Sequence, residues 1–113
     1  MKKFLALYIG SASQAEKAST VISDATQMEG MAAWGSWMAK YEAKIVDAGG
    51  PLGATKRASV EGISDTQNHI TAYVIVEAES HEAAALLFAN HPHFAIFPGD
   101  AVEIIECLAI PSA

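Results

Sequence analysis

Two histidines that flank a proline are the side chains best suited to chemistry in this chain. His91 and His93 stand on either side of Pro92, which stiffens the turn, and Phe94 and Phe97 follow. An imidazole has an ordinary pKa of about 6.5, so a histidine beside a pocket suits general acid–base chemistry. We therefore take both histidines as candidate catalytic residues. The structural alternative is that one caps the carbonyl groups ending a helix and the other is exposed.

The same His-x-His pair becomes a transition-metal site only if a third ligand lies nearby. His69, Asp100 and Glu103 carry suitable side chains, but their spacing places none of them beside the pair. We therefore expect no metal site and no cofactor. The single cysteine, Cys107, falls in a predicted strand and is expected to be a buried, inert thiol.

Three aromatic residues recur at three- and four-residue intervals and so share one face of a helix. They are Trp34, Trp37 and Tyr41. Such a stripe usually packs in a protein core. Gly35 supports an alternative, because it leaves space for a ligand beside the indole rings. The stripe would then line an apolar pocket, with the Tyr41 hydroxyl orienting the ligand. These three residues and Phe94 are the candidate ligand-binding residues.

Six secondary-structure elements must position these side chains. The expected order is a strand at 3–9, a helix at 29–48, a strand at 53–61, a polar connection at 62–68, a strand at 69–78, a helix ending at 90 and a strand at 101–110. Gly49-Gly50-Pro51 is predicted to end the first helix, and Ser80 to cap the second. Ser13 and Glu16 have capping-box spacing, which predicts a helical turn. The βαββαβ order indicates an α+β, ferredoxin-like fold: a four-stranded antiparallel sheet with both helices on one face.

Both faces of the predicted sheet are apolar. In the third strand, Val74 and Val76 point to one side, and Tyr73 and Ile75 point to the other. Two helices can cover only one of these faces. An uncovered apolar face usually marks a protein interface, and the two-fold dimer is the commonest assembly. We therefore expect a homodimer that packs through its open sheet faces.

Composition limits the class of protein. The chain has 113 residues, of which 51% are hydrophobic and 18% charged, which fits one folded domain spanning 1–113 and excludes a disordered chain. The net charge is −6, and the only adjacent basic pairs are Lys2-Lys3 and Lys56-Arg57, so nucleic acid is not an expected partner. The longest apolar run, Ala83 to Ala89, is far shorter than the roughly 20 residues of a membrane span.

The amino terminus has two interpretations. Met1-Lys2-Lys3, the apolar stretch 4–10 and the small residues at 11–13 imitate a short signal peptide. However, the apolar stretch is barely long enough, contains Tyr8 and is also the predicted first strand. A single cysteine cannot form an internal disulfide, and the chain has no Asn-x-Ser/Thr sequon. We therefore expect a cytoplasmic protein.

Seven segments in a fixed order carry a family resemblance. They are Lys2-Lys3-Phe4-Leu5, the helix Trp34–Tyr41, Ile45-Val46-Asp47-Ala48-Gly49-Gly50-Pro51-Leu52-Gly53, Tyr73-Val74-Ile75-Val76-Glu77-Ala78-Glu79-Ser80, Ala83-Ala84-Ala85, Asn90-His91-Pro92-His93 and Val102-Glu103-Ile104. On these residues the chain resembles the YCII-related group of the dimeric α+β barrel superfamily. The resemblance implies a ferredoxin-like protomer that pairs into a barrel. It also implies a cleft of the kind in which superfamily relatives bind small, often aromatic or carbonyl-bearing substrates.

The chain departs from that family pattern at its reactive positions. The better-studied members pair a histidine of the first helix with an aspartate that precedes a proline after the second helix. Here the first helix has no histidine, and His91 stands before Pro92 in place of the aspartate. Part of the family carries Asp-Gly-Pro-Phe in mid-chain, where this chain has Glu61-Gly62-Ile63-Ser64-Asp65. The resemblance therefore carries no catalytic pair over to this chain.

Three functions remain open. The first is a cofactor-independent enzyme in which His91 or His93 moves a proton on a small aromatic or carbonyl compound. The second is a non-catalytic module that binds a similar ligand, and the third is a protein-interaction domain with no pocket. A cavity beside the aromatic stripe separates the third from the others, and the placement of the histidine nitrogens separates the first two.

Overall fold

The computed structural model describes residues 1–10, 23–96 and 99–111. Four strands form its central sheet in the order β2-β5-β1-β6: β1 Lys2–Ile9, β2 Ile45–Pro51, β5 Ile70–Ala78 and β6 Ala101–Cys107. Every neighbouring pair is antiparallel, and β1 lies between β5 and β6. This interleaving of two βαβ halves confirms the expected ferredoxin-like fold class.

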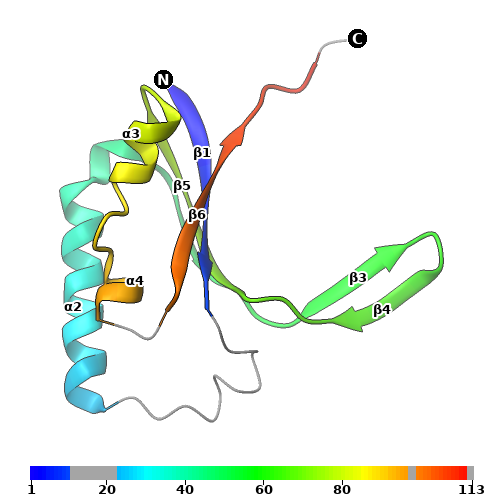
Figure 1. Cartoon of the computed structure of the whole chain (residues 1–113), viewed down its shortest axis with the longest axis horizontal. Coiled ribbons are helices and arrows are strands. Elements are labelled where there is room, and N and C mark those ends of the chain that lie inside the picture. The colour runs from blue at the N-terminus through cyan, green and yellow to red at the C-terminus, as the bar shows by residue number, and fades with distance from the viewer. Residues whose placement is uncertain (11–22, 97–98, 112–113) are drawn as a thin grey trace.

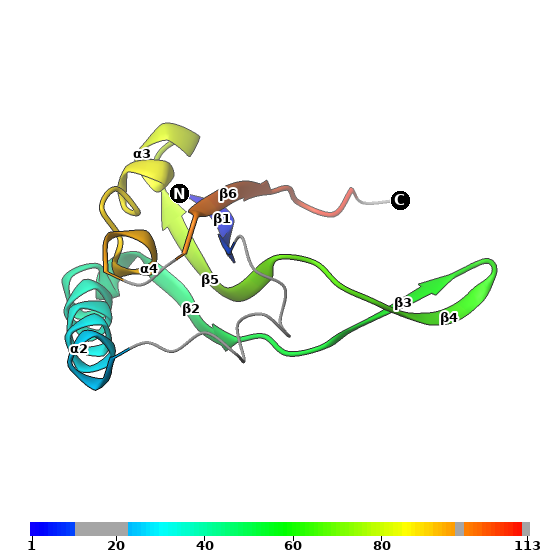
Figure 2. The ribbon, with the colours of Figure 1, turned by 60° about the horizontal axis from the view of Figure 1, so that its bottom comes forward.

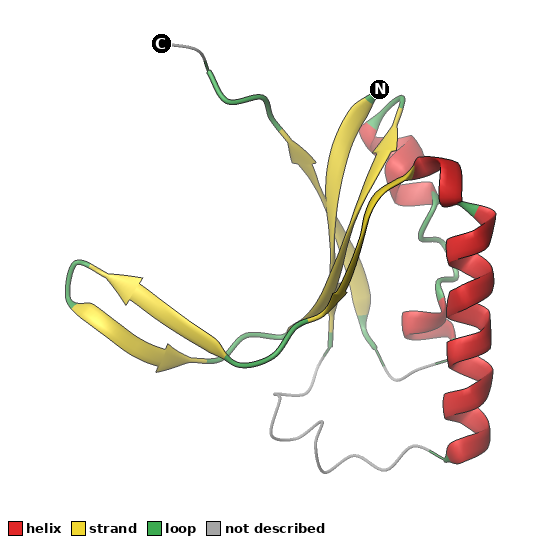
Figure 3. Cartoon of the chain, turned by 180° about the vertical axis from the view of Figure 1, so that it is seen from behind, coloured by secondary structure: helices red, strands yellow, loops and turns green. Residues whose placement is uncertain are grey.

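The helices lie on one face of the sheet, as Figures 1 and 3 show. They are α2 (Asp24–Lys40), α3 (His81–Leu86) and α4 (Pro92–Ala95), with a 3₁₀ turn, η1, at Glu42–Lys44. Serines cap two of them: the Ser23 hydroxyl accepts from the Thr26 amide at 3.2 Å, and the Ser80 hydroxyl accepts from the Ala83 amide at 3.0 Å. The predicted Ser80 cap is therefore confirmed. In the part of the chain described, no helix is long and apolar enough to span a membrane.

The core lies between the helices and the sheet. Its buried apolar residues are Phe4, Ala6, Tyr8, Trp37, Val74, Val76, Ala78, Ala84 and Phe88. Alternate residues of β1 and β5 supply most of this set, because successive side chains in a strand point to opposite faces. On the second face, Leu5 and Leu7 are half-buried and Ile105 is 47% exposed. None of the described helices covers that face (Figure 1).

The predicted boundary of the first helix is wrong. The helix ends at Lys40 rather than at Ala48, and residues 45–51 form the edge strand β2. The doublet Gly49-Gly50 is not a helix stop. It lies in a bulged part of the strand, where the register with β5 shifts and Gly49 has φ 64°. The Asp47 carboxylate accepts from the Gly49 amide at 2.8 Å and fixes the bulge.

The strand predicted at 53–61 forms over residues 55–59, but it is not part of the four-stranded sheet, as the prediction had it. Residues of that segment and of the expected polar connection form a separate hairpin, β3 (Thr55–Ser59) with β4 (Gly62–Thr66). In Figure 2 this hairpin extends away from the sheet. Every residue from 56 to 66 is exposed, so the hairpin adds nothing to the apolar core of the protomer.

Two further boundaries differ from prediction. The second helix stops at Leu86, after which i to i+3 bonds such as Phe88 N to Ala85 O (3.0 Å) tighten the chain, and Asn90 takes a left-handed φ of 58°. The last strand ends at Cys107, and this cysteine is exposed rather than buried. The helical turn predicted at Ser13 and Glu16 lies outside the described residues.

Candidate functional site

A cavity of about 370 Å³ lies between α2 and the sheet. Its lining residues are Tyr8, Met31, Trp34, Gly35, Met38, Ala48, Gly50, Pro51, Ala72 and Tyr73. No carboxylate, imidazole or amine occurs among them. A mostly apolar cavity of this size accommodates a small ring compound.

Small residues create this space. Nothing lies within 4 Å of the position that a Cβ of Gly35 or of Gly50 would occupy, so both glycines border open volume. Ala72 of β5 is also part of the wall. The tryptophan ahead of Gly35 supplies an aromatic wall, since Trp34 is only partly buried. The glycine that the sequence marked as leaving room beside the indoles therefore borders a cavity.

Tyr8 is a lining residue whose side chain has a buried polar partner. Its side chain is 1% exposed, and its hydroxyl lies 3.2 Å from Nε2 of His91. Tyr73 also lines the cavity, but its neighbour Val74 is buried on the helix side. By strand alternation, the Tyr73 side chain points to the opposite face of the sheet. Tyr8 is therefore the tyrosine whose side chain belongs to the helix side.

His91 is fully buried in an aromatic surround. The centre of its ring lies 4.6 Å from that of Trp34, 4.7 Å from that of Trp37, 5.1 Å from that of Tyr8 and 5.9 Å from that of Phe88. The Trp34 contact is edge-to-face, at an interplanar angle of 87°. Such contacts fix the imidazole in one orientation.

The hydrogen bonds of His91 assign its proton. Nδ1 accepts from the backbone amide of His93 at 3.0 Å and so caps the short helix α4. A neutral imidazole with an accepting Nδ1 carries its proton on Nε2. Nε2 therefore donates to the Tyr8 hydroxyl, which leaves the phenolic proton available for another acceptor.

Burial keeps this pair neutral. Desolvation, followed by the charge of His93, lowers the pKa of His91 to about 4. Desolvation also raises the pKa of the Tyr8 phenol well above its ordinary value. At neutral pH the imidazole is uncharged and the phenol keeps its proton. His91 and Tyr8 are thus two neutral hydrogen-bond donors in series: His91 donates to the Tyr8 hydroxyl, and the Tyr8 hydroxyl can donate its own proton.

His93 is also buried, at 7% exposure. Its Nε2 lies 2.8 Å from the carbonyl oxygen of Ile9, and since a carbonyl only accepts, Nε2 donates. The backbone amide of Gly99 donates to the His93 carbonyl at 2.9 Å, and a Cβ at Gly99 would overlap the His93 ring. His93 therefore ties α4 to the sheet. The structural alternative expected one of the two histidines to be exposed, and that part of it is wrong because both are buried.

The other predicted ligand-binding residues lie apart from the cavity. The Trp37 indole donates to the carbonyl of Leu87 at 2.8 Å and is 7% exposed, so it packs in the core. Tyr41 follows the last turn of α2 and packs on Trp37, with ring centres 5.4 Å apart. Of the aromatic stripe, Trp34 lines the cavity, and neither Trp37 nor Tyr41 is among its lining residues.

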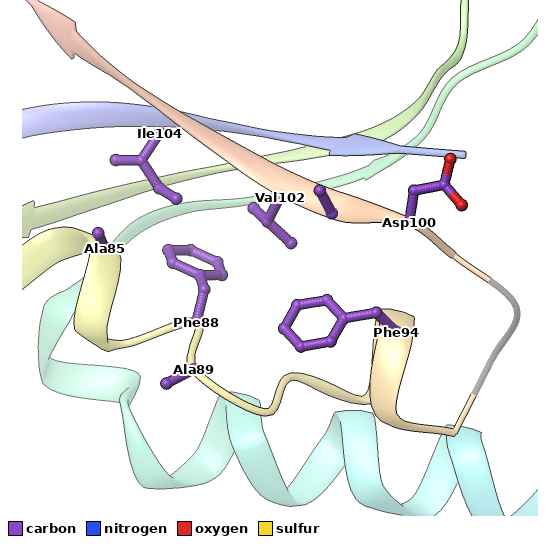
Figure 4. Close-up of a pocket in the computed structure, with 8 residues that line it drawn as sticks. Ala85, Phe88, Ala89, Phe94, Asp100, Val102 and Ile104 are labelled. Carbon is purple, nitrogen blue, oxygen red and sulfur yellow. The ribbon is translucent and has the colours of Figure 1, made fainter. Parts of the chain in front are cut away.

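Phe94 lies at a second cavity of about 310 Å³, beneath β6. Figure 4 shows its ring and that of Phe88 facing this space, with Asp100 at one end. The structure thus places Trp34 and Phe94 in different cavities. Among the residues described, no group of three or more His, Cys, Asp or Glu side chains is arranged to hold a metal ion.

Sequence reasoning missed Tyr8. By strand alternation Tyr8 shares a face of β1 with Phe4 and Ala6, and all three are buried in the core. Its partner His91 is 83 residues away, so no local spacing links them. The one available signal was a hydroxyl on an otherwise apolar strand face, since a buried tyrosine hydroxyl usually has a hydrogen-bond partner.

Comparison of the sequence with known protein families found no match, and comparison with curated proteins found none either. Among solved structures, the chain is similar to 5-chloro-2-hydroxyhydroquinone dehydrochlorinase from Burkholderia phenoliruptrix AC1100, in its complex with 2,5-dihydroxybenzoquinone. The TM-score is 0.52 at 21% identity, over 90% of this chain and 89% of that chain. At this identity the likeness establishes the fold alone. The chain has a ferredoxin-like α+β fold, which it shares with that enzyme.

Proposed function

We propose that this protein binds a small ring compound bearing a carbonyl or similar oxygen in the cavity beside Trp34. We further propose that it is a cofactor-independent enzyme that stabilises negative charge on that oxygen. The observation that carries the proposal is the hydrogen bond between the buried His91 and Tyr8, which is one of the residues lining the cavity. The family we expect is the YCII-related group of the superfamily.

The direction of that hydrogen bond decides what the pair does. Because Nδ1 of His91 is occupied by the His93 amide and Nε2 is protonated, neither nitrogen of the neutral ring is free to accept a proton. The pair therefore acts as a donor: His91 donates to Tyr8, and Tyr8 donates to the bound oxygen. A donor held in place in a dry site favours an enolate or other oxyanion over the neutral carbonyl. This role differs from the proton transfer by histidine that the sequence predicts.

The residues that line the cavity indicate the class of ligand. Trp34 and the methionines of α2 offer apolar, adaptable surface, and Tyr8 offers a polar group. A flat ring with one oxygen acceptor satisfies both. The dehydrochlorinase of the same fold was solved with a dihydroxybenzoquinone, which is a ring with carbonyl oxygens, and this supports the choice by analogy.

The alternative is a binding protein without catalysis. It is favoured by the lining itself, in which the described residues provide no general base. Under this alternative, the same compounds bind and the same Tyr8 hydrogen bond selects them, but no bond to hydrogen is broken.

The assembly we propose is a homodimer formed through the open sheet face, in the cytoplasm. Leu5, Leu7 and Ile9 lie half-buried on that face, and no described helix packs over them. Packing of two such faces against each other would bury apolar surface that is exposed to water in a monomer.

A matched pair of probes tests the proposal. Acetophenone and ethylbenzene have the same ring, but only the ketone has an oxygen that Tyr8 can reach. We expect acetophenone to bind about fivefold more tightly, since a neutral hydrogen bond contributes about 1 kcal/mol. Amide chemical shifts around the cavity give both affinities. Tyr8→Phe should remove the preference, and Tyr73→Phe, on the opposite face, should keep it.

Isotope exchange separates the enzyme from the binding protein. Solvent hydroxide removes a methyl proton of acetophenone to give the enolate, which then takes up deuterium from D₂O, and stabilisation of the enolate by Tyr8 would accelerate that exchange. Faster exchange with the wild type, lost in Tyr8→Phe, supports an enzyme. Selective binding without faster exchange supports the alternative. Equal affinity for both probes would contradict the proposed role of Tyr8. All variants should carry Cys107→Ser, because the exposed thiol is a competing nucleophile.

A further inference from the structure

The β3–β4 hairpin, residues 55–66, forms an arm that stands away from the protomer. β3 and β4 pair only with each other, in a separate two-stranded sheet. Every residue of the arm except Thr55 is exposed, and Figures 2 and 3 show it extending into open space. At its base, the Asn68 side-chain amide donates to the Thr55 hydroxyl at 3.1 Å. An isolated two-stranded hairpin is at best marginally stable in water, so we expect this arm to be stabilised by packing against another surface.

The two faces of the arm differ. Ala58 pairs with Ile63, and Lys56 pairs with Asp65 on the same face, where their charged groups lie 2.6 Å apart. The opposite face carries Arg57, Ser64 and other polar residues. Ile63 is 77% exposed, and Val60 at the tip is fully exposed. One face therefore presents apolar side chains near the tip and an ion pair nearer the base, and the other face is polar.

The arm leaves the protomer on the side of the open sheet face. In Figure 1 the helices lie to one side of the sheet, and the arm extends to the other. The segment after β6 leaves on that side too, with Leu108 79% and Ile110 93% exposed. Any molecule packed on the open face would thus lie between these two apolar projections.

The exposed area matches a second copy. The chain exposes 7647 Å², whereas a compact monomer of its mass exposes about 6,000 Å². The difference is about twice the roughly 800 Å² that each partner buries in a standard interface. A surplus of that size is large enough to accommodate a homodimer interface.

We propose that the arm embraces a second copy of this chain, with Ala58, Val60 and Ile63 packed on the partner. The two-fold axis makes the contact reciprocal, so each protomer supplies one arm and receives one. The polar face with Arg57 and Ser64 stays in solvent. This inference rests on the homodimer proposed above and adds a contact that sheet packing alone does not provide.

Adjacent residues on opposite faces of the arm provide the test. Ile63→Lys places a charge on the apolar face, and Ser64→Lys places the same charge on the polar face. Sedimentation velocity over a concentration series should show the dimer dissociation constant raised at least about tenfold by Ile63→Lys and unchanged by Ser64→Lys. Both positions are exposed in the protomer, so neither change should affect its folding.

A spin label at Val60→Cys, in the Cys107→Ser background, reports on the arm directly. We expect the label to be immobilised at concentrations where the protein is dimeric and mobile where it is monomeric. If Ile63→Lys leaves the dimer intact and the label at position 60 stays mobile in the dimer, the proposed arm contact is wrong but the homodimer stands. A wild type that stays monomeric at every concentration would overturn both.

Discussion

Protonation of His91 should destabilise the fold in a defined pH window. The imidazole is fully buried, and its Nδ1 accepts from the His93 amide. A second proton must go on Nδ1, where it removes the acceptor that caps α4 and puts a charge among aromatic rings. The pKa of His91 is lowered to about 4 in the folded protein, by desolvation first and by His93 second. In the unfolded chain it is about 6.5.

The sign and size of the change in unfolding free energy follow from the linkage between proton binding and folding. Because the unfolded chain binds the proton more tightly, the stabilisation is complete above about pH 6.5 and is lost as the pH falls toward 4. The full shift corresponds to at most about 3 kcal/mol. Solvent screening of the charged ring reduces this value, so we expect about 2 kcal/mol.

The assay is urea unfolding at several pH values, followed by tryptophan fluorescence, since Trp34 and Trp37 both contact the imidazole. His91→Asn keeps an oxygen acceptor for the cap and removes the titrating ring. Its free energy of unfolding should fall less than that of the wild type between pH 7 and pH 4, by about 2 kcal/mol. His91→Phe, which preserves the ring, should behave in the same way. Parallel pH profiles for wild type and both variants would refute a buried, neutral His91.

Four substitutions test the packing of α2 and of the bulge in β2. Gly49→Ala should destabilise the fold by more than about 1 kcal/mol, because Gly49 has φ 64° and a Cβ there would overlap the β5 backbone. Gly50→Ala places its Cβ in open space and should destabilise the fold less. Chemical denaturation measures both free energies of unfolding. Trp37→Phe should cost about 1–3 kcal/mol by thermal unfolding, since it leaves the Leu87 carbonyl without the indole donor. Gly35→Ala should raise the melting temperature, because alanine is the better helix former by about 1 kcal/mol and meets no neighbour within 4 Å, and a lower melting temperature would contradict the open volume beside it.

The sequence predicts correctly the strands in which buried and half-buried residues alternate. The prediction fails where a pair of glycines is compatible both with the end of a helix and with a bulged strand. Val74 and Val76 alternate with half-buried neighbours, so β5 follows directly from the pattern. At Gly49-Gly50, a doublet that ordinarily ends a helix instead allows a bulged edge strand. Ile45 reinforced the error, because it continues the helical spacing yet pairs with Val76 in the sheet. Only the tertiary pairing decides between these outcomes.

The candidate site was predictable where the signal was local. Gly35 beside Trp34 pointed to space on α2, and the cavity lies there. The Tyr8–His91 hydrogen bond joins β1 to the turn before α4 across the whole fold, and no spacing rule reaches that far. For the same reason the sequence could not assign the His91 proton, which depends on the backbone of His93.

The central claim is that the cavity beside Trp34 holds a ring compound whose oxygen is bound by Tyr8. A crystal structure of the protein soaked with acetophenone tests it most directly. We predict the ring between Trp34 and the sheet, with the ketone oxygen within hydrogen-bond distance of the Tyr8 hydroxyl. A ring bound instead beside Phe88 and Phe94, or a ketone oxygen turned away from Tyr8, would contradict the account.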